Sequence, residues 1–222
     1  MLESPLRVLA PHYCVSCDTI GQILCMYCKY NIESEQYEAC LMCSGPVGGG
    51  EALCSHHILP YSRAWCVGER SAALRALLDQ YKFERAKDAY HELAQLLDLS
   101  LPVLPEDVVV VPVPTIAPHI RRRGFDHTAL VAKELAKRRG LIYQHAIERV
   151  TTTSQLGKGK RERRKQAAQA FACVRPAQPG RYLLIDDIFT TGATVEFAAQ
   201  ALRDAGATEV WLAIVARQPL EK

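Results

Sequence analysis

Hydrophobic residues recur with a helical period in the middle of this chain and with no period in the segment that follows. Leucines and one tyrosine are spaced three or four residues apart in the segments 74–81 and 93–97, and this spacing predicts two amphipathic helices. Residues 107–113 are instead a nearly continuous run of valines. Such a run is typical of a strand that is covered on both faces, as in a parallel sheet.

Strand and helix patterns continue to alternate to the end of the chain. They predict a helix at 128–139, a strand at 142–143, a loop at 151–159, a helix at 161–170, a strand at 181–185, a helix at 194–205 and a strand at 209–215. Gly140 and Gly206 follow two of these helices, and glycine commonly ends a helix. Strands that alternate with helices predict an α/β fold with a doubly wound parallel sheet.

The first 65 residues lack this alternation. They contain little helical periodicity and most of the cysteines, and they end in the glycine run 48–50 and the segment 59–61. Because a hydrophobic core alone rarely stabilises fewer than ~70 residues, a bound metal is a physically reasonable way to stabilise this segment. We therefore predict a small metal-binding module at residues 1–65 and an α/β domain at residues 66–222.

Cysteine spacing supports the metal-binding module. Seven of the nine cysteines lie between Cys14 and Cys54, and six of these form Cys-x-x-Cys pairs. Cys54 and His57 repeat the same gap, and each pair can offer two ligands to a tetrahedral Zn²⁺. The candidate ligands are Cys14, Cys17, Cys25, Cys28, Cys40, Cys43, Cys54 and His57.

Eight ligands suffice for two structural zinc sites, taken in chain order or interleaved, and the spacing does not distinguish the two arrangements. The alternatives are redox cysteines or reduced structural thiols. A redox Cys-x-x-Cys usually opens a helix in a thioredoxin-like unit, and nothing in this segment indicates one. Cys66 and Cys173 are isolated, and we expect both to be small buried hydrophobic residues.

Composition narrows the protein class. The chain has 222 residues, of which 49% are hydrophobic and 23% charged, as in an ordinary globular protein. No apolar run approaches the ~20 residues that span a bilayer, and the first residues lack a signal-peptide pattern. We therefore expect a cytoplasmic protein without membrane insertion.

Positive charge is concentrated in two places, although the net charge is only +3. Arg121, Arg122 and Arg123 form one cluster, and the run from Lys158 to Lys165 forms the other. Arginine suits bidentate contact with phosphate. The alternative for both clusters is a solvated basic face. Single-stranded nucleic acid is a third reading, but no aromatic residue lies between Gln144 and Ala170 to stack on bases.

The strand predicted at 181–185 leads into the most specific motif of the chain. Asp186 and Asp187 follow it, and a small hydroxyl-rich segment then opens a helix. Loop amides at a helix N-terminus attract phosphate, and adjacent carboxylates can accept hydrogen bonds from vicinal hydroxyls. The candidate phosphate residues are Thr190, Thr191, Gly192, Ala193 and Thr194. A phosphorylated ribose fits this motif, whereas the alternative is an acidic turn before a capped helix.

Residues 186–194 resemble the phosphoribosyl-pyrophosphate (PRPP) motif of type I phosphoribosyltransferases. The Cys-x-x-Cys module, Tyr81-Lys82-Phe83, Val111-Pro112-Val113-Pro114, Arg122-Arg123-Gly124-Phe125 and Gln155 with its basic run extend the resemblance to the ComF/GntX family. The resemblance implies a type I phosphoribosyltransferase-like fold with an N-terminal zinc module. It also implies that Asp186 and Asp187 hold the ribose hydroxyls directly or through Mg²⁺, with the arginines near the pyrophosphate.

Two functions follow from this resemblance. The first is Mg²⁺-dependent transfer of a phosphoribosyl group from PRPP to an acceptor that the sequence does not reveal, with Asp186 and Asp187 as catalytic residues. The second is a non-catalytic accessory role in DNA uptake and competence, with single-stranded DNA and the competence helicase machinery as partners and PRPP as a regulator. A zinc-organised interaction module is a weaker third reading.

Three positions call for particular attention. Asp126-His127 stands where the family usually has Asn-Gln, and a carboxylate there would repel pyrophosphate unless a cation faces it. His57 stands where the family usually has Cys. Lys82 can reach an anion or lie along an apolar surface, and we slightly favour the second role.

Overall fold

A parallel sheet of five strands forms the centre of the computed structural model, which describes residues 13–70, 72–83, 87–150 and 170–219. Across the sheet the strands lie in the order β1 (Arg63–Glu69), β7 (Glu209–Arg217), β6 (Arg181–Phe189), β2 (Val109–Pro112) and β3 (Ile142–Tyr143). The chain passes from β2 outward to β3 and then crosses back to β6. The order therefore reverses between β2 and β6, and in open α/β sheets such a switch point is where ligands bind.

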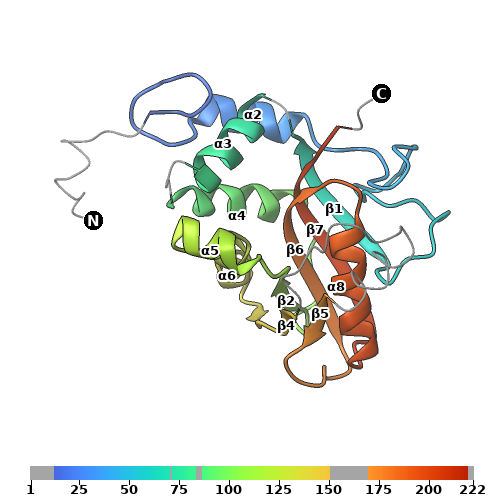
Figure 1. Cartoon of the computed structure of the whole chain (residues 1–222). Coiled ribbons are helices and arrows are strands. Elements are labelled where there is room, and N and C mark those ends of the chain that lie inside the picture. Colours follow the sequence, from blue (N-terminus) through green and yellow to red (C-terminus); the bar gives the residue numbers. More distant parts are fainter. Residues whose placement is uncertain (1–12, 71, 84–86, 151–169, 220–222) are drawn as a thin grey trace, which may run out of the picture.

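Helices cover both faces of the sheet (Figure 1). The helices of the described residues are α2 (Met26–Ser34), α3 (Ala72–Phe83), α4 (Ala89–Ser100), α5 (Ala117–Arg123), α6 (His127–Arg139) and α8 (Ala193–Asp204). α4 and α6 pack on one face, and α8 packs on the other beside a short antiparallel pair, β4 (Ile147–Arg149) and β5 (Phe171–Cys173). The predicted α/β class is confirmed.

Both faces of the sheet are buried because neighbouring residues of a strand point to opposite sides. Leu183 lies in the core beneath α4 and α6, whereas Leu184 lies in the core beneath α8. Valines 110 and 111 divide between the two cores in the same way. This double burial explains why the strands are continuous apolar runs rather than alternating ones.

The cysteine-rich segment shares these two cores with the sheet. Cys14, Leu24 and Ile32 belong to the core beneath α4 and α6, and Tyr37 and Leu41 belong to the core beneath α8. In Figure 1, α2 lies beside α3 at the end of the sheet to which the strands run. The buried Lys29 of α2 is ion-paired with Glu92 of α4 at 2.8 Å.

Several predicted elements are found within one or two residues of their expected bounds. They are the helices at 128–139 and 194–205 and the strands at 107–113, 142–143 and 209–215. The strand predicted at 181–185 is longer, because β6 continues through Asp186 and Asp187 to Phe189 in register with β7. Pairing with a neighbouring strand, rather than local polarity, sets where β6 ends.

β1, α2, α5 and the β4–β5 pair were not expected from the pattern. β1 has five consecutive buried residues, and it pairs with β7 at the edge of the sheet. The predicted loop at 151–159, most of the predicted helix at 161–170 and the basic run from Lys158 to Lys165 lie outside the described residues. Over the described part of the chain, no helix combines the length and apolar character that crossing a bilayer requires.

Candidate functional site

Two groups of four ligand side chains form in the cysteine-rich segment. Within each group the ligand atoms all lie within 4.8 Å of one another, so each group can hold a metal ion. The groups follow chain order rather than an interleaved order. The first group is Cys14, Cys17, Cys25 and Cys28, and the second is Cys40, Cys43, Cys54 and His57.

The thiols within each group differ in acidity. Against a hydrogen bond with Ser16, burial raises the pKa of Cys28 to about 12, and against a backbone hydrogen bond of His56, burial raises the pKa of Cys54. Backbone amides of Met42, Cys43 and Cys54 stabilise the Cys40 thiolate and, against the effect of burial, lower the pKa of Cys40 to about 6. A hydrogen bond with Thr19 lowers the pKa of Cys17 to about 6. His57 Nε2 is buried and has no hydrogen-bond partner among the described residues, as expected of a nitrogen that faces a cation. Three thiolates and one imidazole are a ligand set that zinc accepts.

Asp186 and Asp187 lie near the carboxyl end of β6, beside the switch point of the sheet. β2 is a neighbouring strand of β6 in the sheet, and the segment 190–192 leads from β6 into α8. Asp186 Oδ1 accepts a hydrogen bond from the backbone amide of Asp187 at 2.9 Å. The two carboxylates are therefore neighbours in the chain but have different surroundings.

Asp187 is held by two basic side chains from distant elements. Lys82, at the end of α3, forms an ion pair with Oδ2 of Asp187. His127 Nε2 lies 2.6 Å from the same oxygen. The weak preference for an apolar packing role of Lys82 is therefore wrong, because its ammonium group reaches a carboxylate that is only 14% exposed.

Arg123 fixes the ring of His127 from the other side. Nη1 of Arg123 lies 2.8 Å from Nδ1 of His127. Because a guanidinium group only donates, Nδ1 accepts, and the ring proton is on Nε2, which donates to Asp187. Arg123, His127 and Asp187 thus form a hydrogen-bonded chain from α5 through the start of α6 to β6.

These contacts give the two carboxyl groups opposite acidities. Burial and the neighbouring charge of Asp187 raise the pKa of Asp186 to about 8. Burial also acts on Asp187, but the hydrogen bond from His127 and the charge of Lys82 hold the pKa of Asp187 below its usual range. Asp187 is therefore the anion of this pair, whereas Asp186 keeps a proton more readily than an ordinary carboxyl group.

Asp126 has a structural role that the sequence did not reveal. Its Oδ1 accepts from the backbone amide of Ala129 at 3.1 Å, which caps α6, and from the Thr115 hydroxyl at 3.0 Å. Thr115 belongs to the loop after β2. The carboxylate thus fixes this loop to α6, and the expected repulsion of an anion is opposed by Arg123, whose charge lies near Asp126.

The segment after β6 is shaped by close packing. Gly192 has a φ of +81°, and a Cβ atom there would lie 2.6 Å from the Phe189 ring and 3.3 Å from the Met42 sulfur. Only glycine fits both the backbone conformation and the space. Thr190, Thr191, Ala193 and Thr194 are exposed around it. Met42 lies in the chain between Cys40 and Cys43, so the segment that carries the second metal group approaches this loop through Met42.

The three predicted arginines are placed differently. They form the last turn of α5, where Arg121 and Arg122 are exposed and Arg123 is half-buried against His127. Sequence reasoning gave His127 no role and did not single out Arg217, which ends β7 beneath the 190–192 segment. The available signal for Arg217 was a cation at the end of a strand that is apolar from Val210 to Ala216.

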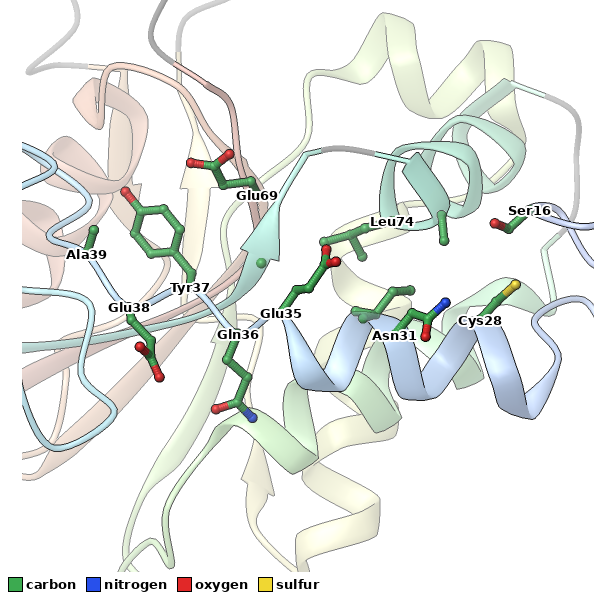
Figure 2. Close-up of a pocket in the computed structure, with 13 residues that line it drawn as sticks. Ser16, Cys28, Asn31, Glu35, Gln36, Tyr37, Glu38, Ala39, Glu69 and Leu74 are labelled. Carbon is green, nitrogen blue, oxygen red and sulfur yellow. The ribbon is translucent and has the colours of Figure 1, made fainter.

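A separate cavity of about 470 Å³ lies between α2, the segment 35–39 and the start of α3. Figure 2 shows Glu35, Glu38 and Glu69 around it. The cavity lies at the N-terminal end of α3, whereas Lys82 meets Asp187 at the C-terminal end of the same helix. The cavity is therefore distinct from the carboxylate site.

Comparison with known proteins gives relatives over most of the chain, although no family model matches it. The chain is 30% identical over 204 residues to the DNA utilization protein YhgH of Salmonella typhi, covering 85% of this chain and 88% of that protein. It is 29% identical over 219 residues to the Escherichia coli K12 protein of the same name, and the match covers 85% of this chain and 95% of that protein. Competence protein ComFC of Streptococcus pneumoniae is 28% identical over 203 residues, and the match covers 89% of this chain and 84% of that protein.

Among solved structures, a glutamine PRPP amidotransferase from B. subtilis complexed with ADP and GMP matches with a TM-score of 0.41 and 22% identity. The match covers 56% of this chain and 25% of that one, so the chain spans about a quarter of its length. The identity and coverage shared with the YhgH and ComFC proteins confirm the resemblance seen in the sequence. This chain belongs to the ComF family of DNA utilization and competence proteins.

Proposed function

We propose that this protein binds PRPP at the carboxyl end of β6 and transfers its phosphoribosyl group to an acceptor. One observation carries the proposal. Two carboxyl groups, Asp186 and Asp187, lie beside an exposed threonine–glycine loop that opens α8, at the switch point of the sheet. Loop amides at a helix N-terminus suit the 5′-phosphate, and the carboxyl groups suit the vicinal ribose hydroxyls.

The residues around the carboxyl groups have separable roles in this proposal. Asp187 stays anionic because Lys82 and His127 hold it. One carboxyl oxygen of Asp186 accepts a hydrogen bond from the Asp187 amide. The other oxygen would bind a ribose hydroxyl or Mg²⁺, whose preferred ligands are carboxylate oxygens and water. Bound Mg²⁺ would neutralise charge on the pyrophosphate. Arg121, Arg122 and Arg123 add positive charge on the same side, beyond the loop after β2.

Transfer breaks the bond between the ribose C1 atom and the pyrophosphate oxygen, and the acceptor forms the new bond at C1. Positive charge develops on the ribose as the leaving group departs, and the anionic carboxylate of Asp187 stabilises it electrostatically. Fixed side chains cost no reorganisation when this charge appears. The hydrogen-bonded chain from Arg123 through His127 keeps Asp187 in one orientation.

Calorimetric titration of the protein with PRPP and Mg²⁺ tests the proposal. We expect saturable binding in the unmodified protein and its loss in the double variant Asp186→Asn, Asp187→Asn. Asp107→Asn is a matched control, because Asp107 is exposed and pairs with Arg181 at the other end of the sheet. No binding by the unmodified protein, or equal binding by the double variant, would contradict it. Pyrophosphate release with candidate bases and amines then tests transfer.

Single-stranded DNA binding is a second candidate function, and a specific observation favours it. Relatives are named for DNA utilization and competence, and Tyr13, Tyr27 and Tyr30 of the metal-binding segment are 55%, 72% and 66% exposed. Exposed aromatic rings can stack on unpaired bases. In this role the protein would assist DNA uptake together with competence helicases, and PRPP would regulate it.

A salt titration distinguishes contact with DNA phosphates from stacking alone. We expect the affinity for single-stranded DNA to fall as salt rises, and to fall further in the Tyr27→Ala, Tyr30→Ala variant. Val103→Ala is a control, because Val103 is exposed on the α4–β2 connection. If the affinity for single-stranded DNA changes neither with salt concentration nor with substitution of the tyrosines, this role is excluded.

We also propose that Zn²⁺ occupies both ligand groups and acts structurally. Four protein ligands close the coordination sphere and leave no position for a substrate. The metal-binding segment supplies residues to both cores of the sheet, so its folding and that of the sheet are linked.

A further inference from the structure

Arg217 is a buried cation directly behind the loop that follows β6. Its side chain is at the end of β7, and the residue is 3% exposed. Nη1 donates to the carbonyl oxygens of Phe189 at 3.2 Å and Thr190 at 2.8 Å. The same nitrogen lies 2.6 Å from the carbonyl oxygen of Gln218. A single guanidinium group therefore binds two successive carbonyls of the loop.

The direction of these carbonyls decides where the loop amides point. All described peptide bonds are trans, so each carbonyl points away from the N–H group of the same peptide unit. The Phe189 carbonyl is held inward by Arg217 together with the Gln218 amide, which donates to it at 2.9 Å, and Arg217 holds the Thr190 carbonyl inward. The amides of Thr190 and Thr191 in those peptide units are directed the opposite way. Thr190 and Thr191 are exposed. Among the described residues, no acceptor binds the Thr191 amide.

The charge of Arg217 has no anionic partner among the described residues. The described groups that it contacts are neutral, and they include three carbonyl groups, the Phe189 ring at 5.1 Å and the Tyr37 hydroxyl. Nε is buried without an acceptor in this part of the chain. An unpaired buried charge is costly, and an anion on the outer side of the loop would offset that cost.

We propose that Arg217 is a positioning residue for phosphate, which helps to orient the loop amides outward and supplies behind them a buried positive charge that no described carboxylate pairs with. This inference rests on the proposed binding of a phosphorylated ribose at the same loop. It adds a second source of anion affinity to the helix N-terminus of α8. It also predicts that charge at position 217 matters, although the side chain touches no ligand.

Three substitutions separate the two parts of this role. Arg217→Lys keeps the charge, Arg217→Gln keeps a hydrogen-bond donor without charge, and Arg217→Met removes both. Titration with ribose 5-phosphate should give at least about tenfold weaker binding for the Gln and Met variants, because a full charge is lost at low dielectric. The Lys variant should recover most of the affinity, which a purely structural role would not produce.

Arg203→Met is the matched control. Arg203 donates to the carbonyls of Ala207 and Thr208 at the far end of α8, so it has the same chemistry away from the loop. We expect its affinity for ribose 5-phosphate to be unchanged. If the Gln variant does not fold, the alternative test is arginine-selective nitrogen NMR of the unmodified protein. In that experiment the Arg217 Nε signal should shift as ribose 5-phosphate is added.

The outcomes distinguish this inference from the function on which it rests. Equal affinity of the Gln variant and the unmodified protein, or an unmoved Nε signal during saturation, would overturn the role of Arg217 alone. Failure of the unmodified protein to bind either ribose 5-phosphate or PRPP would overturn both proposals.

Discussion

Lys82 of α3 and Asp187 of β6 form an ion pair in which the side chains are only 11% and 14% exposed. The pair connects the helix that follows the edge strand β1 to a carboxylate near the end of a central strand. Because His127 binds the same carboxylate oxygen, one anion joins three elements. Substitutions around this anion therefore test the arrangement of the site as well as its stability.

Lys82→Met should lower the free energy of unfolding by about 1–3 kcal/mol, because breaking a largely buried pair leaves an uncompensated carboxylate. Urea unfolding at neutral pH measures this change. Lys133→Met, on the exposed side of α6, is the control and should stay within about 0.5 kcal/mol of the unmodified protein. Equal stability of the Lys82 variant would show that the pair does not contribute.

Asp186→Asn and Asp187→Asn should change the pH dependence of stability in opposite directions. The raised pKa of Asp186, about 8, means that the folded protein keeps a proton that the unfolded chain loses near pH 4. The unmodified protein therefore loses stability as the pH rises towards 8. Asp186→Asn removes this loss, so its melting temperature should exceed that of the unmodified protein by a few degrees at pH 8.

The lowered pKa of Asp187 has the reverse consequence. Its pairs contribute stability above the unfolded pKa of about 4, and this contribution is lost as the pH falls below that value. Asp187→Asn should therefore be less stable than the unmodified protein at pH 7, with a difference that shrinks in acid. Thermal melts from pH 3 to pH 9 measure both variants. Parallel profiles would contradict the assignment of opposite acidities.

Gly192→Ala should destabilise the protein by about 1–3 kcal/mol, because the positive φ and the contact with Phe189 both oppose a Cβ atom. Binding of PRPP should weaken as well, since the residue lies within the loop. Gly180→Ala is the control, because among the described residues a Cβ atom there would come no nearer than 3.9 Å to another atom, the Gln178 carbonyl oxygen. Similar unfolding curves for the two variants would rule out the predicted clash.

Metal analysis should give two equivalents of zinc for the purified protein. Cys14→Ser and His57→Ala should each lower this to about one, since each removes a ligand from a different group of four. His57→Cys should keep two equivalents, because it restores a four-cysteine site. Cys173→Ser is the control, since Cys173 lies outside both groups. Loss of both ions in a single-ligand variant would contradict two independent sites.

The elements that the sequence predicted well are those in which local pattern and tertiary burial agree. β2 and β7 are largely apolar runs buried on both faces, and the helices of 128–139 and 194–205 bury apolar residues spaced three or four apart, such as Val131 and Leu135 or Val195 and Ala199. β1 was missed because five apolar residues can belong to a strand or to a helix. α2 was missed because its inward face consists of Cys28, Lys29 and Ile32, which does not form an apolar stripe.

The sequence by itself determined the chemistry that is contiguous in the chain. The carboxylates, the threonine–glycine segment and the Cys-x-x-Cys pairs are each defined by neighbours a few residues apart, and local spacing is sufficient to find them. Only the tertiary structure decided which residues act on them. Lys82, His127 and Arg217 come from α3, α6 and β7, and they meet Asp187 or the loop after β6 because parallel strands bring their carboxyl ends to one edge. Acidity and charge at the site depend on these distant neighbours, because electrostatic interaction follows distance in space rather than distance along the chain.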